Sequence, residues 1–458
     1  MIRRFLGKVF SGRLFKSAQP RVIPLKTHRI ARDHVSRHAA KVCETLQQKS
    51  HAAYIVGGAV RDLLLGGIPK DYDVATDATP EEVRAIFRRS RIIGRRFRLV
   101  HVMFGNETIE VSTFRGDSGG VNDADAAKQG EHTTDEHGRI LRDNVFGSLE
   151  DDARRRDFSV NAMFYDPVRE EVLDYHGGIN DIKARRLRMI GDPAQRYRED
   201  PIRMLRAVRL AAARGLEIEA HTRKPIRELA DLLLNVPKAR VFDEMMKLLL
   251  SGHAAEAVRR LRKEGLHHGV LPLLDVILEQ PLGERFVMLA LENTDSRIIE
   301  GKTVSPGFLF AALLWHEVLA AWKAAQARGM HTMPALFDAM DRVLQVQAEK
   351  LAITRRYGAD MKDIWALQAR FLNRSGRRPY LLLEHPRFRA GFDFLLLRCQ
   401  SREIDSEAGA WWEKFQHADE PARAGMLMTD GPGAGKKRRR PRRKKKPVAV
   451  PALETGAA

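Results

Sequence analysis

Two aspartates, Asp71 and Asp73, stand two residues apart in a short run that is predicted to be a β-strand. Because side chains alternate along a strand, both carboxylates share one face, with Cα atoms roughly 6.6 Å apart. Carboxylates so placed can hold cations between them, and a two-metal phosphoryl-transfer site needs ions about 3.5–4 Å apart. The pair predicts binding of Mg²⁺, with Mn²⁺ as the alternative, and chemistry on a phosphate.

The residues before this strand are predicted to form a first strand over 53–56, a glycine turn and a helix over 60–65. Gly57 and Gly58 lie where a backbone can approach a phosphate closely, because glycine has no Cβ and tolerates unusual dihedral angles. Arg61 follows within the next turn and adds a positive charge. Together with the two aspartates, the turn predicts a site for a nucleoside triphosphate with Mg²⁺.

A third acid, Glu110, lies within the run 108–114, which is also predicted to be a strand. An acid in the middle of an otherwise apolar strand is costly to bury without a partner. Glu110 therefore either completes a carboxylate cluster with Asp71 and Asp73 or faces solvent on an edge strand.

Two further charged segments have both a structural and a functional interpretation. Residues 154–157 form a dense cluster that is either a solvated face or a source of phosphate clamps and a carboxylate. Asp200 precedes Pro201, the pattern of a helix N-cap and first position, and in the helix that follows, Arg203, Arg206 and Arg209 stand three apart. Asp200 either caps this helix alone or joins arginines that hold phosphates or read a base edge.

Several other site classes are not supported by the sequence. It lacks a Walker P-loop and a dinucleotide fingerprint, and its single histidines have no pattern of a hydrolase triad. Its two cysteines, Cys43 and Cys399, lie far apart, which argues against structural zinc and favours a reducing cytoplasm. The longest apolar run, 308–315, is too short for the ~18–20 residues of a membrane span. The basic, amphipathic start of the chain leaves weak binding to a membrane surface open.

The 458 residues leave room for about three domains, and their net charge of +20 is concentrated at the two ends. Residues 1–32 contain nine Lys and Arg and no acid, and residues 431–458 contain ten and one acid. A nearly neutral globule with two cationic ends predicts a polyanionic partner, either nucleic acid or an anionic membrane surface, with a solubilising tail as the plainer interpretation. The predicted RNA-binding residues of the tail are Lys436, Lys437, Arg438, Arg439, Arg440, Arg442, Arg443, Lys444, Lys445 and Lys446.

The predicted fold is an α+β head with a mixed sheet and helices, followed by an all-α neck, body and C-terminal region, with disordered basic ends. The expected boundaries are a basic arm over 1–32, a catalytic head over 33–165, a helical neck over 166–295, a helical arginine-rich domain over 296–420 and a basic tail over 421–458. Tryptophans in the helical parts are expected in the core rather than stacked on bases.

Four ordered motifs carry a resemblance to a known family: Gly57-Gly-Ala-Val-Arg-Asp62, Lys70-Asp-Tyr-Asp-Val74, Arg155-Arg-Asp-Phe-Ser-Val-Asn161 and Glu199-Asp-Pro-Ile-Arg-Met-Leu-Arg206. They resemble the motifs of the polymerase β-like nucleotidyltransferases of the bacterial poly(A) polymerase and CCA-adding type. The run from Gly94 to Gly105 and the C-terminal residues 363–370, 381–398 and 411–416 resemble the poly(A) polymerase branch.

The resemblance implies transfer of AMP from ATP to RNA 3′ ends without a template. Asp71 and Asp73 would hold Mg²⁺, Asp157 would act in the active site, and Glu110 remains an alternative ligand of the metals. The implied nucleotide-binding residues are Gly57, Gly58, Arg61, Asp62, Arg156, Asn161, Asp200, Arg203 and Arg206. Among these, Asp200 and Arg203 are the expected base readers.

Two alternatives to this activity remain at the level of sequence. A CCA-adding tRNA nucleotidyltransferase with a C-terminal extension would stop after three nucleotides. A non-catalytic RNA-binding protein on a transferase fold would not need the intact Asp71 and Asp73. Partners from RNA decay, such as a helicase, an RNA chaperone or a nuclease, are compatible with the predicted activity.

Overall fold

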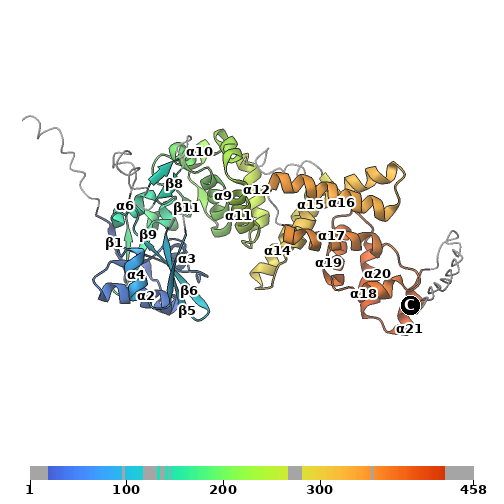
Figure 1. The fold of residues 1–458 in the computed structure, drawn as a ribbon, viewed down its shortest axis with the longest axis horizontal. Coiled ribbons are helices and arrows are strands. Elements are labelled where there is room, and N and C mark those ends of the chain that lie inside the picture. Colours follow the sequence, from blue (N-terminus) through green and yellow to red (C-terminus); the bar gives the residue numbers. More distant parts are fainter. Residues whose placement is uncertain are drawn as a thin grey trace, which may run out of the picture.

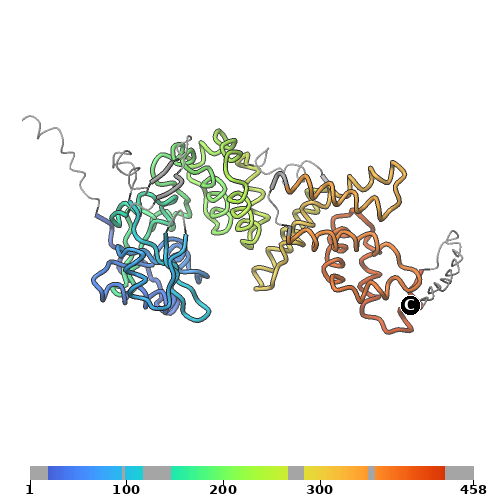
Figure 2. Tube along the Cα trace, viewed as in Figure 1, coloured from blue at the N-terminus to red at the C-terminus, as the bar shows by residue number. Residues whose placement is uncertain are grey.

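The protein is elongated, with a sheet-containing head at one end and helices along the rest of its length (Figure 1). The structure, a computed structural model, describes residues 19–94, 98–116, 132–134, 140–143, 146–266, 281–351 and 355–428. The chain runs from the head through a first group of helices to a second group at the far end, without returning to the head (Figure 2). The predicted α+β head followed by a mainly helical remainder is confirmed. The neck is not all-α as predicted, because β11 (Arg186–Leu187) and β12 (Glu217–Ile218) form a short parallel pair within it.

The head is built on an eight-stranded mixed sheet with the strand order β1-β10-β9-β2-β3-β6-β5-β4. The strands are β1 (Arg21–Pro24), β2 (Ala53–Val56), β3 (Asp73–Thr76), β4 (Ser90–Ile93), β5 (Leu99–Phe104), β6 (Glu107–Thr113), β9 (Met163–Asp166) and β10 (Glu171–Asp174). β3 and β6 are parallel, whereas β2 with β3 and β5 with both β4 and β6 are antiparallel. β7 (His132–Thr134) and β8 (Ile140–Asp143) form a separate two-stranded sheet.

Helices α2 (Arg37–Gln48) and α4 (Pro80–Ile86) cover one face of the β3–β6–β5–β4 part of the sheet. Val42 and Val83 from these helices pack with sheet residues such as Val74 and Val111 in the main hydrophobic core. The predicted capping box is confirmed, because the Thr79 hydroxyl accepts from the Glu82 amide and the Glu82 carboxylate accepts from the Thr79 amide.

The sheet extends beyond the predicted head at both ends. The expected arm over 1–32 contains β1 and the short helix α1 (Leu25–His28), so at least residues 21–28 belong to the folded head. β10 lies beyond the expected limit at residue 165, between β1 and β9. The edge strand β1 has little alternation of apolar and polar residues, and its pairing with β10 marks it as a strand. Of the predicted disordered tail over 421–458, residues 429–458 lie outside the described residues. Its first residues are wrongly predicted, because α21 (Glu420–Met426) is a helix.

The helices that follow the head pack side by side in the middle of the molecule (Figure 1). They are α8 (Pro193–Glu199), α9 (Ile202–Arg214), α10 (Ala220–Glu228), α11 (Lys238–Leu249) and α12 (Ala254–Glu264). Helix α9 is the centre of this group, since it contacts α8, α11 and α12. Its buried face is formed by residues such as Met204, Leu205 and Val208.

The C-terminal helices form a further layer of packing. They are α14 (Pro281–Ile299), α15 (Pro306–Ala327), α16 (Thr332–Leu351), α17 (Arg355–Phe371), α18 (Arg378–Leu383), α19 (Phe388–Gln400), α20 (Ser406–His417) and α21 (Glu420–Met426). As expected, tryptophans are core residues: Trp315, Trp365 and Trp412 are fully buried. Their indole N–H groups donate to Glu403, to the Ala311 carbonyl and to the Phe371 carbonyl, respectively.

Within the described residues, α15 is the helix that is long and apolar enough to cross a membrane by length and composition alone. However, 61% of that apolar stretch is buried inside the protein. Helix α15 is apolar over a longer stretch than the predicted run 308–315. Its packing against α14, α16 and α17 accounts for this apolar character.

The buried His316 on α15 generates a prediction about stability. Among the described residues neither ring nitrogen has a hydrogen-bond partner, and the ring contacts Phe286 edge-on at 5.4 Å between centroids. Burial lowers its pKa below the ordinary value, with Lys323 and Arg398 adding to the effect and Glu403 opposing it. As pH falls, the imidazole is protonated in the unfolded chain before it is protonated in the folded protein. The contribution of neutral His316 to the free energy of unfolding is therefore fully present above about pH 6.5 and is lost as pH falls below that value.

We therefore expect that His316→Leu loses less of its thermal stability between pH 7 and pH 5 than the unaltered protein does. His417→Gln is the matched control, since His417 is exposed beside Glu413. Calorimetric unfolding at the two pH values measures the effect. An equal loss in His316→Leu and in the unaltered protein would contradict it.

Candidate active site

The predicted carboxylates come together through the register of the head sheet. Strand β3 begins at Asp73, so Asp71 precedes the strand rather than lying within it as predicted. Asp71 and Asp73 are nevertheless both exposed while Tyr72 between them is buried, as alternation requires. Tyr72 fixes this approach, because its hydroxyl donates to the His34 carbonyl at 2.5 Å.

Glu110 is the direct partner of Asp73 across the parallel pair β3 and β6. Directly paired residues point to the same face and have neighbouring side chains. Strand β6 has β3 on one side and β5 on the other, so the alternative in which Glu110 lies on an edge strand is wrong. The other face of β6 carries Ile109, Val111 and Thr113, all buried.

The electrostatics of Asp73 reflect this arrangement. Desolvation raises the pKa of its carboxyl to about 6, the charges of Glu110 and Asp71 act in the same direction, and Arg156 opposes them. The residue as a whole is exposed, so solvent reaches one side of the carboxylate while protein atoms crowd the other. Carboxylates in such proximity resist ionisation together, and a bound cation relieves this repulsion.

The donor set consists of hard oxygen ligands, which fit Mg²⁺ or Mn²⁺ rather than zinc. Within the described residues, no three or more acidic, histidine or cysteine side chains are already drawn together closely enough to hold a metal ion. Asp73 and Glu110 thus lie on one face of the sheet, with Asp71 just before β3, and the three carboxylates are not closed around a common point.

The glycine turn lies beside these carboxylates. Gly57 caps helix α3 (Gly58–Leu64) with φ of 70°, a region that favours glycine, and a Cβ there would lie 3.3 Å from the Arg156 guanidinium. Val56, directly before the turn, pairs with Asp73. The amides at the start of α3 and the Arg156 side chain therefore flank the carboxylate row. Arg156 itself is held by Asp152 at 2.8 Å and lies over the Phe164 ring.

A chain of hydrogen bonds connects α3 to the neck helix α9. Arg206 on α9 donates to one oxygen of the buried Asp157 at 2.9 Å, and the other oxygen accepts from the Asn161 side chain at 3.0 Å and from the Phe158 amide at 2.8 Å. Burial alone would raise the pKa of Asp157, but Arg206 and the other two donors hold it below its usual range. Asp157 is therefore an ionised, fully engaged carboxylate.

The chain continues on the head side. The Asn161 side-chain oxygen accepts from Arg61 at 2.7 Å, and Arg61 also donates to Asp62 at 2.8 Å. The second oxygen of Asp62 accepts from Arg214, near the C-terminal end of α9, at 2.7 Å. Asp62, predicted to bind nucleotide, thus has both oxygens occupied by arginines and acts as a link between α3 and α9.

The predicted base readers lie at the junction of α8 and α9. The side chain of Asp200 does not cap α9, contrary to the capping interpretation, because Pro201 is the N-cap and no side-chain cap bond is present. Instead Arg240 on α11 donates to one Asp200 oxygen at 3.1 Å, and the other oxygen is buried without a partner among the described residues. Arg203 donates to the Arg196 carbonyl at 2.7 Å and to Glu199 at 3.1 Å.

His101 is a residue that the sequence interpretation missed. It pairs with Glu110 across β5 and β6, with 3.6 Å between its Nε2 atom and the carboxylate. A lone histidine in a strand has no local signal, and only strand register places it next to the carboxylates.

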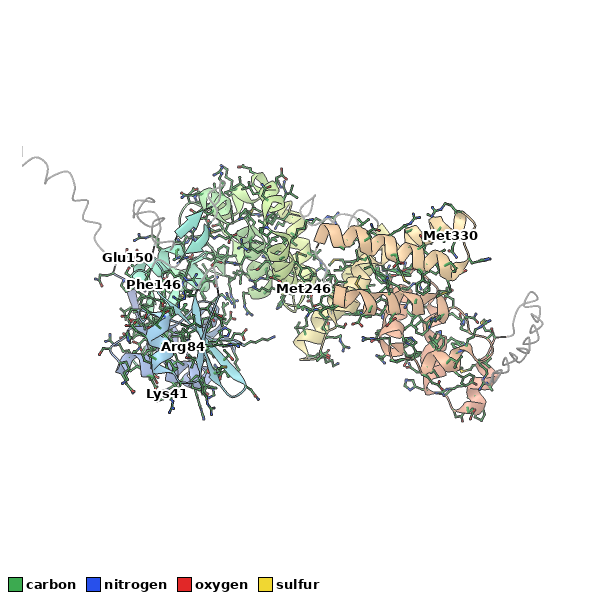
Figure 3. All side chains as sticks on the ribbon, in the orientation of Figure 1. Lys41, Arg84, Phe146, Glu150, Met246 and Met330 are labelled. Carbon is green, nitrogen blue, oxygen red and sulfur yellow. The ribbon has the colours of Figure 1, made fainter. Side chains whose placement is uncertain are left out.

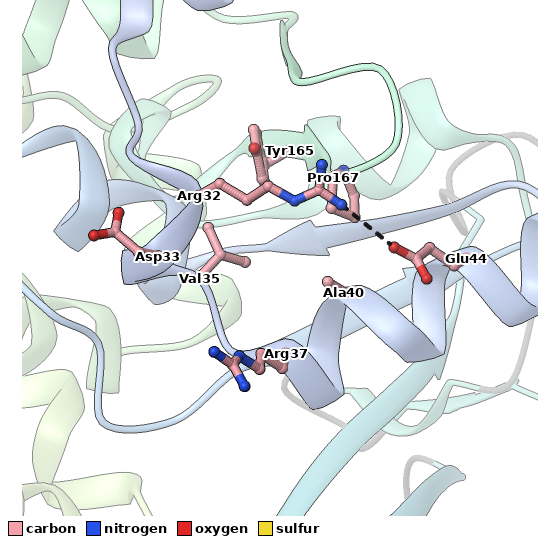
Figure 4. A pocket seen from close by; sticks show the side chains of 8 residues that line it. All are labelled: Arg32, Asp33, Val35, Arg37, Ala40, Glu44, Tyr165 and Pro167. Carbon is pink, nitrogen blue, oxygen red and sulfur yellow. Dashed lines mark ion pairs between the residues drawn. The ribbon is translucent and has the colours of Figure 1, made fainter.

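A separate cavity of about 480 Å³ lies against α2, and no predicted site residue lines it (Figure 4). Arg32 and Glu44 form an ion pair there, with 3.8 Å between their side chains. The residues of the predicted basic tail from Lys436 to Lys446 lie outside the described part of the chain.

Comparison with known proteins decides the family. Three family models match the chain: the Poly A polymerase head domain over residues 53–188, the Probable RNA and SrmB- binding site of polymerase A over 215–278, and the Polymerase A arginine-rich C-terminus over 328–446. Poly(A) polymerase I of Salmonella typhi is 44% identical over 433 residues, 92% of each chain. The chain belongs to the bacterial poly(A) polymerase family. Poly(A) polymerase I of Haemophilus influenzae is similar in the same way, at 43% identity over 90% of this chain and 92% of that one.

CCA-adding enzymes are more distant relatives of this poly(A) polymerase family member. The enzyme of Bacillus pumilus is 37% identical, but over only 49% of this chain and 52% of its own. The crystal structure of the Bacillus stearothermophilus CCA-adding enzyme in complex with CTP aligns with a TM-score of 0.54 at 27% identity, covering 82% of this chain and 80% of that one. The family resemblance inferred from the four motifs is confirmed.

The arrangement of acids predicts different effects for Glu110 and Asp157. We expect Glu110→Gln to weaken Mg²⁺ binding at least tenfold, a scale that even outer-shell partners of metals reach. Asp157→Asn should leave Mg²⁺ affinity nearly unchanged, since both oxygens of Asp157 already have protein donors. Titration calorimetry with Mg²⁺ measures both variants.

Glu107→Gln is the matched control for Glu110→Gln. Glu107 lies three residues earlier on β6, where Ser36 donates to it at 2.6 Å and His38 lies at 2.5 Å. Mg²⁺ binding that depends on Asp157 but not on Glu110 would show that the third acid has been assigned wrongly.

Proposed function

We propose that this protein transfers AMP from ATP to the 3′ hydroxyl of RNA, repeatedly and without a template. The observation that carries the proposal is the pairing of Asp73 with Glu110 beside a glycine turn, in a chain that matches Poly(A) polymerase I over 92% of its length. A carboxylate row beside backbone amides suits a reaction that depends on positioning and neutralisation of charge.

In this proposal Asp71, Asp73 and Glu110 would hold two divalent cations. The cations would lower the pKa of the attacking hydroxyl and neutralise the charge on the leaving pyrophosphate. A bond forms between the RNA 3′ oxygen and the α-phosphorus, the bond from that phosphorus to the β-phosphate bridging oxygen breaks, and the hydroxyl proton leaves to solvent.

The remaining side chains bind and orient the nucleotide. Gly57 and Gly58 let the start of α3 approach the phosphates, and Arg156 faces them from beside the turn. The buried Arg61 lies beside Gly58 and donates to Asn161, and Asp62 and Asp157 hold this pair in place. Since Arg206 is paired with Asp157, it sets the position of α9 against the head rather than contacting phosphate directly.

Choice of adenine is assigned to Asp200 and Arg203. One buried oxygen of Asp200 has no donor among the residues that the structure describes, and such an atom costs about 1–3 kcal/mol until a donor arrives. The exocyclic amine of adenine is a donor of the right kind. The Asp200 oxygen is buried in the present conformation, so base entry requires local movement at the junction of α8 and α9.

The cytoplasm is the proposed location, and single-stranded RNA 3′ ends are the proposed acceptors. The match of residues 215–278 to a probable RNA and SrmB-binding site supports contact with RNA and with a protein partner. The basic residues 436–446 add phosphate contacts in this proposal, as their charge suggests.

The second candidate, a CCA-adding activity, is favoured by the CCA-adding structure that aligns over 82% of the chain. It is weakened by the arginine-rich C-terminal match over residues 328–446, and by the Bacillus pumilus CCA-adding enzyme matching only 49% of this chain. A non-catalytic role does not explain why Asp73 is paired with Glu110 on one face of the sheet, with the charge of Asp71 close enough to raise its pKa.

Purified protein with Mg²⁺, an unstructured RNA and each nucleoside triphosphate in turn provides the test. We expect a long ladder of products with ATP and little extension with CTP, GTP or UTP. Asp73→Asn, which removes a ligand charge, should reduce incorporation at least a thousandfold. A stop after three nucleotides on trimmed tRNA would identify the CCA-adding activity, and unchanged incorporation by Asp73→Asn would contradict the catalytic assignment.

A further inference from the structure

The carboxylates are one end of a longer row of paired residues across the sheet. Asp73 on β3 pairs with Glu110 on β6, Glu110 pairs with His101 on β5, and His101 pairs with Arg91 on β4. Because direct partners point to the same face, all four side chains lie on one face of the sheet. With neighbouring strands ~4.8 Å apart, the row spans about 14 Å from Asp73 to the sheet edge.

This face is not covered by α2 and α4, which pack on the opposite face through the core residues Val42 and Val83. Helix α6 (Leu149–Arg155) covers the row's own face farther along, where Ala153 packs with Val56 and Phe164. Toward β4 the row is open to solvent: the Glu110 and His101 side chains are 44% and 27% exposed.

The edge strand β4 and the residue before it supply positive charge that no acid in the described part of the chain neutralises. Arg89, directly before β4, is level with Met103, whose amide donates to the Arg89 carbonyl. Arg89 and Arg91 are exposed, and among the described residues neither guanidinium makes an ion pair or hydrogen bond. The nearby acids of α4 are engaged elsewhere, Glu81 with Arg98 and Glu82 in the capping box.

The neck arginines differ in this respect. Arg203, Arg206 and Arg209 are each bound to an acid, so their charges are neutralised inside the protein. The two arginines at the edge of β4 are free to bind a polyanion that lies on the face of the row. The His101 ring offers a surface for base stacking, and Met103, 39% exposed on that face, adds apolar surface beside it.

We propose that the acceptor RNA strand crosses this face of the head sheet, with its 3′ end at Asp73 and its upstream nucleotides over His101 and β4. Arg89 and Arg91 hold the backbone phosphates of those upstream nucleotides. The inference rests on the proposed function, which makes RNA the acceptor, and it adds a binding surface in the head to the RNA-binding match at residues 215–278.

Equilibrium binding tests this surface without any chemistry. The probe is a fluorescent, unstructured RNA with a 3′-deoxy end, titrated without ATP at several salt concentrations. Arg89→Gln/Arg91→Gln should weaken binding and reduce the salt slope by about 1.4, since each phosphate contact on a single strand contributes about 0.7.

The matched control is Lys41→Gln/Arg84→Gln, which also removes two exposed positive charges. Lys41 on α2 and Arg84 on α4 belong to the helices that cover the opposite face (Figure 3). This variant should bind RNA with an unchanged salt slope. Equal slopes in the two double variants, or an unchanged slope in Arg89→Gln/Arg91→Gln, would overturn the proposal.

Cross-linking places the strand directly. A 4-thiouridine two or three nucleotides from the 3′ end should cross-link to peptides from residues 90–104, whereas cross-links confined to residues 215–278 would overturn the proposed path. In steady-state assays, Arg89→Gln/Arg91→Gln should raise the KM for RNA and leave the KM for ATP unchanged. Failure of the unaltered protein to incorporate AMP would refute the proposed function, while the binding and cross-linking results would still decide the path of the RNA.

Discussion

The ion pair between Arg206 and Asp157 is the interaction on which the rest of the site depends. It joins the neck helix α9 to the segment that follows α6, and it leaves a carboxylate that is ionised although buried. Breaking a buried pair by removing one partner typically costs 3–5 kcal/mol, because the other charge remains uncompensated. The strength of this contact gives the head and neck a defined relative position, which a site shared between them requires.

The hydrogen bonds that continue from Asp157 extend this constraint to the phosphate side of the site. Asn161 bridges Asp157 to Arg61, and Asp62 bridges Arg61 to Arg214, so α3 is tied to α9 at two points, two turns apart on α9. The turn at Gly57 and the base readers near Asp200 are thereby held at a fixed separation. The carboxylate row depends instead on the register of β3, β6 and β5, which no local sequence feature specifies.

Local patterns predicted much of this arrangement. Alternation placed Asp71 and Asp73 on one face, the Thr79 capping box gave the start of α4, and the four motifs gave the family. The expected nucleotide-binding residues Arg61, Asn161 and Arg206 lie in one connected network. Local chemistry dictates such features, so a single sequence is sufficient to predict them.

Long-range pairing could not be predicted in the same way. From the sequence, Glu110 could either join a carboxylate cluster or face solvent on an edge strand, and nothing indicated a role for His101. Both positions depend on which strands pair, and this pairing is not encoded locally. A capping role for Asp200 was a plausible local interpretation. In the structure its carboxylate instead accepts a hydrogen bond from Arg240, forty residues later in the chain. Edge strand β1 was not predicted, because it lies in a basic segment without a strand pattern and is recognised as a strand by its pairing with β10.

The central claim is that Asp157 and Arg206 act as one unit that positions the neck for ATP. A double-mutant cycle on ATP affinity, measured by equilibrium binding for Asp157→Asn, Arg206→Gln and the combined variant, tests it most directly. We expect the combined variant to bind ATP about as weakly as either single variant, with a coupling energy of at least about 1 kcal/mol, within the range for residues in contact. Additive losses in the combined variant would contradict the account.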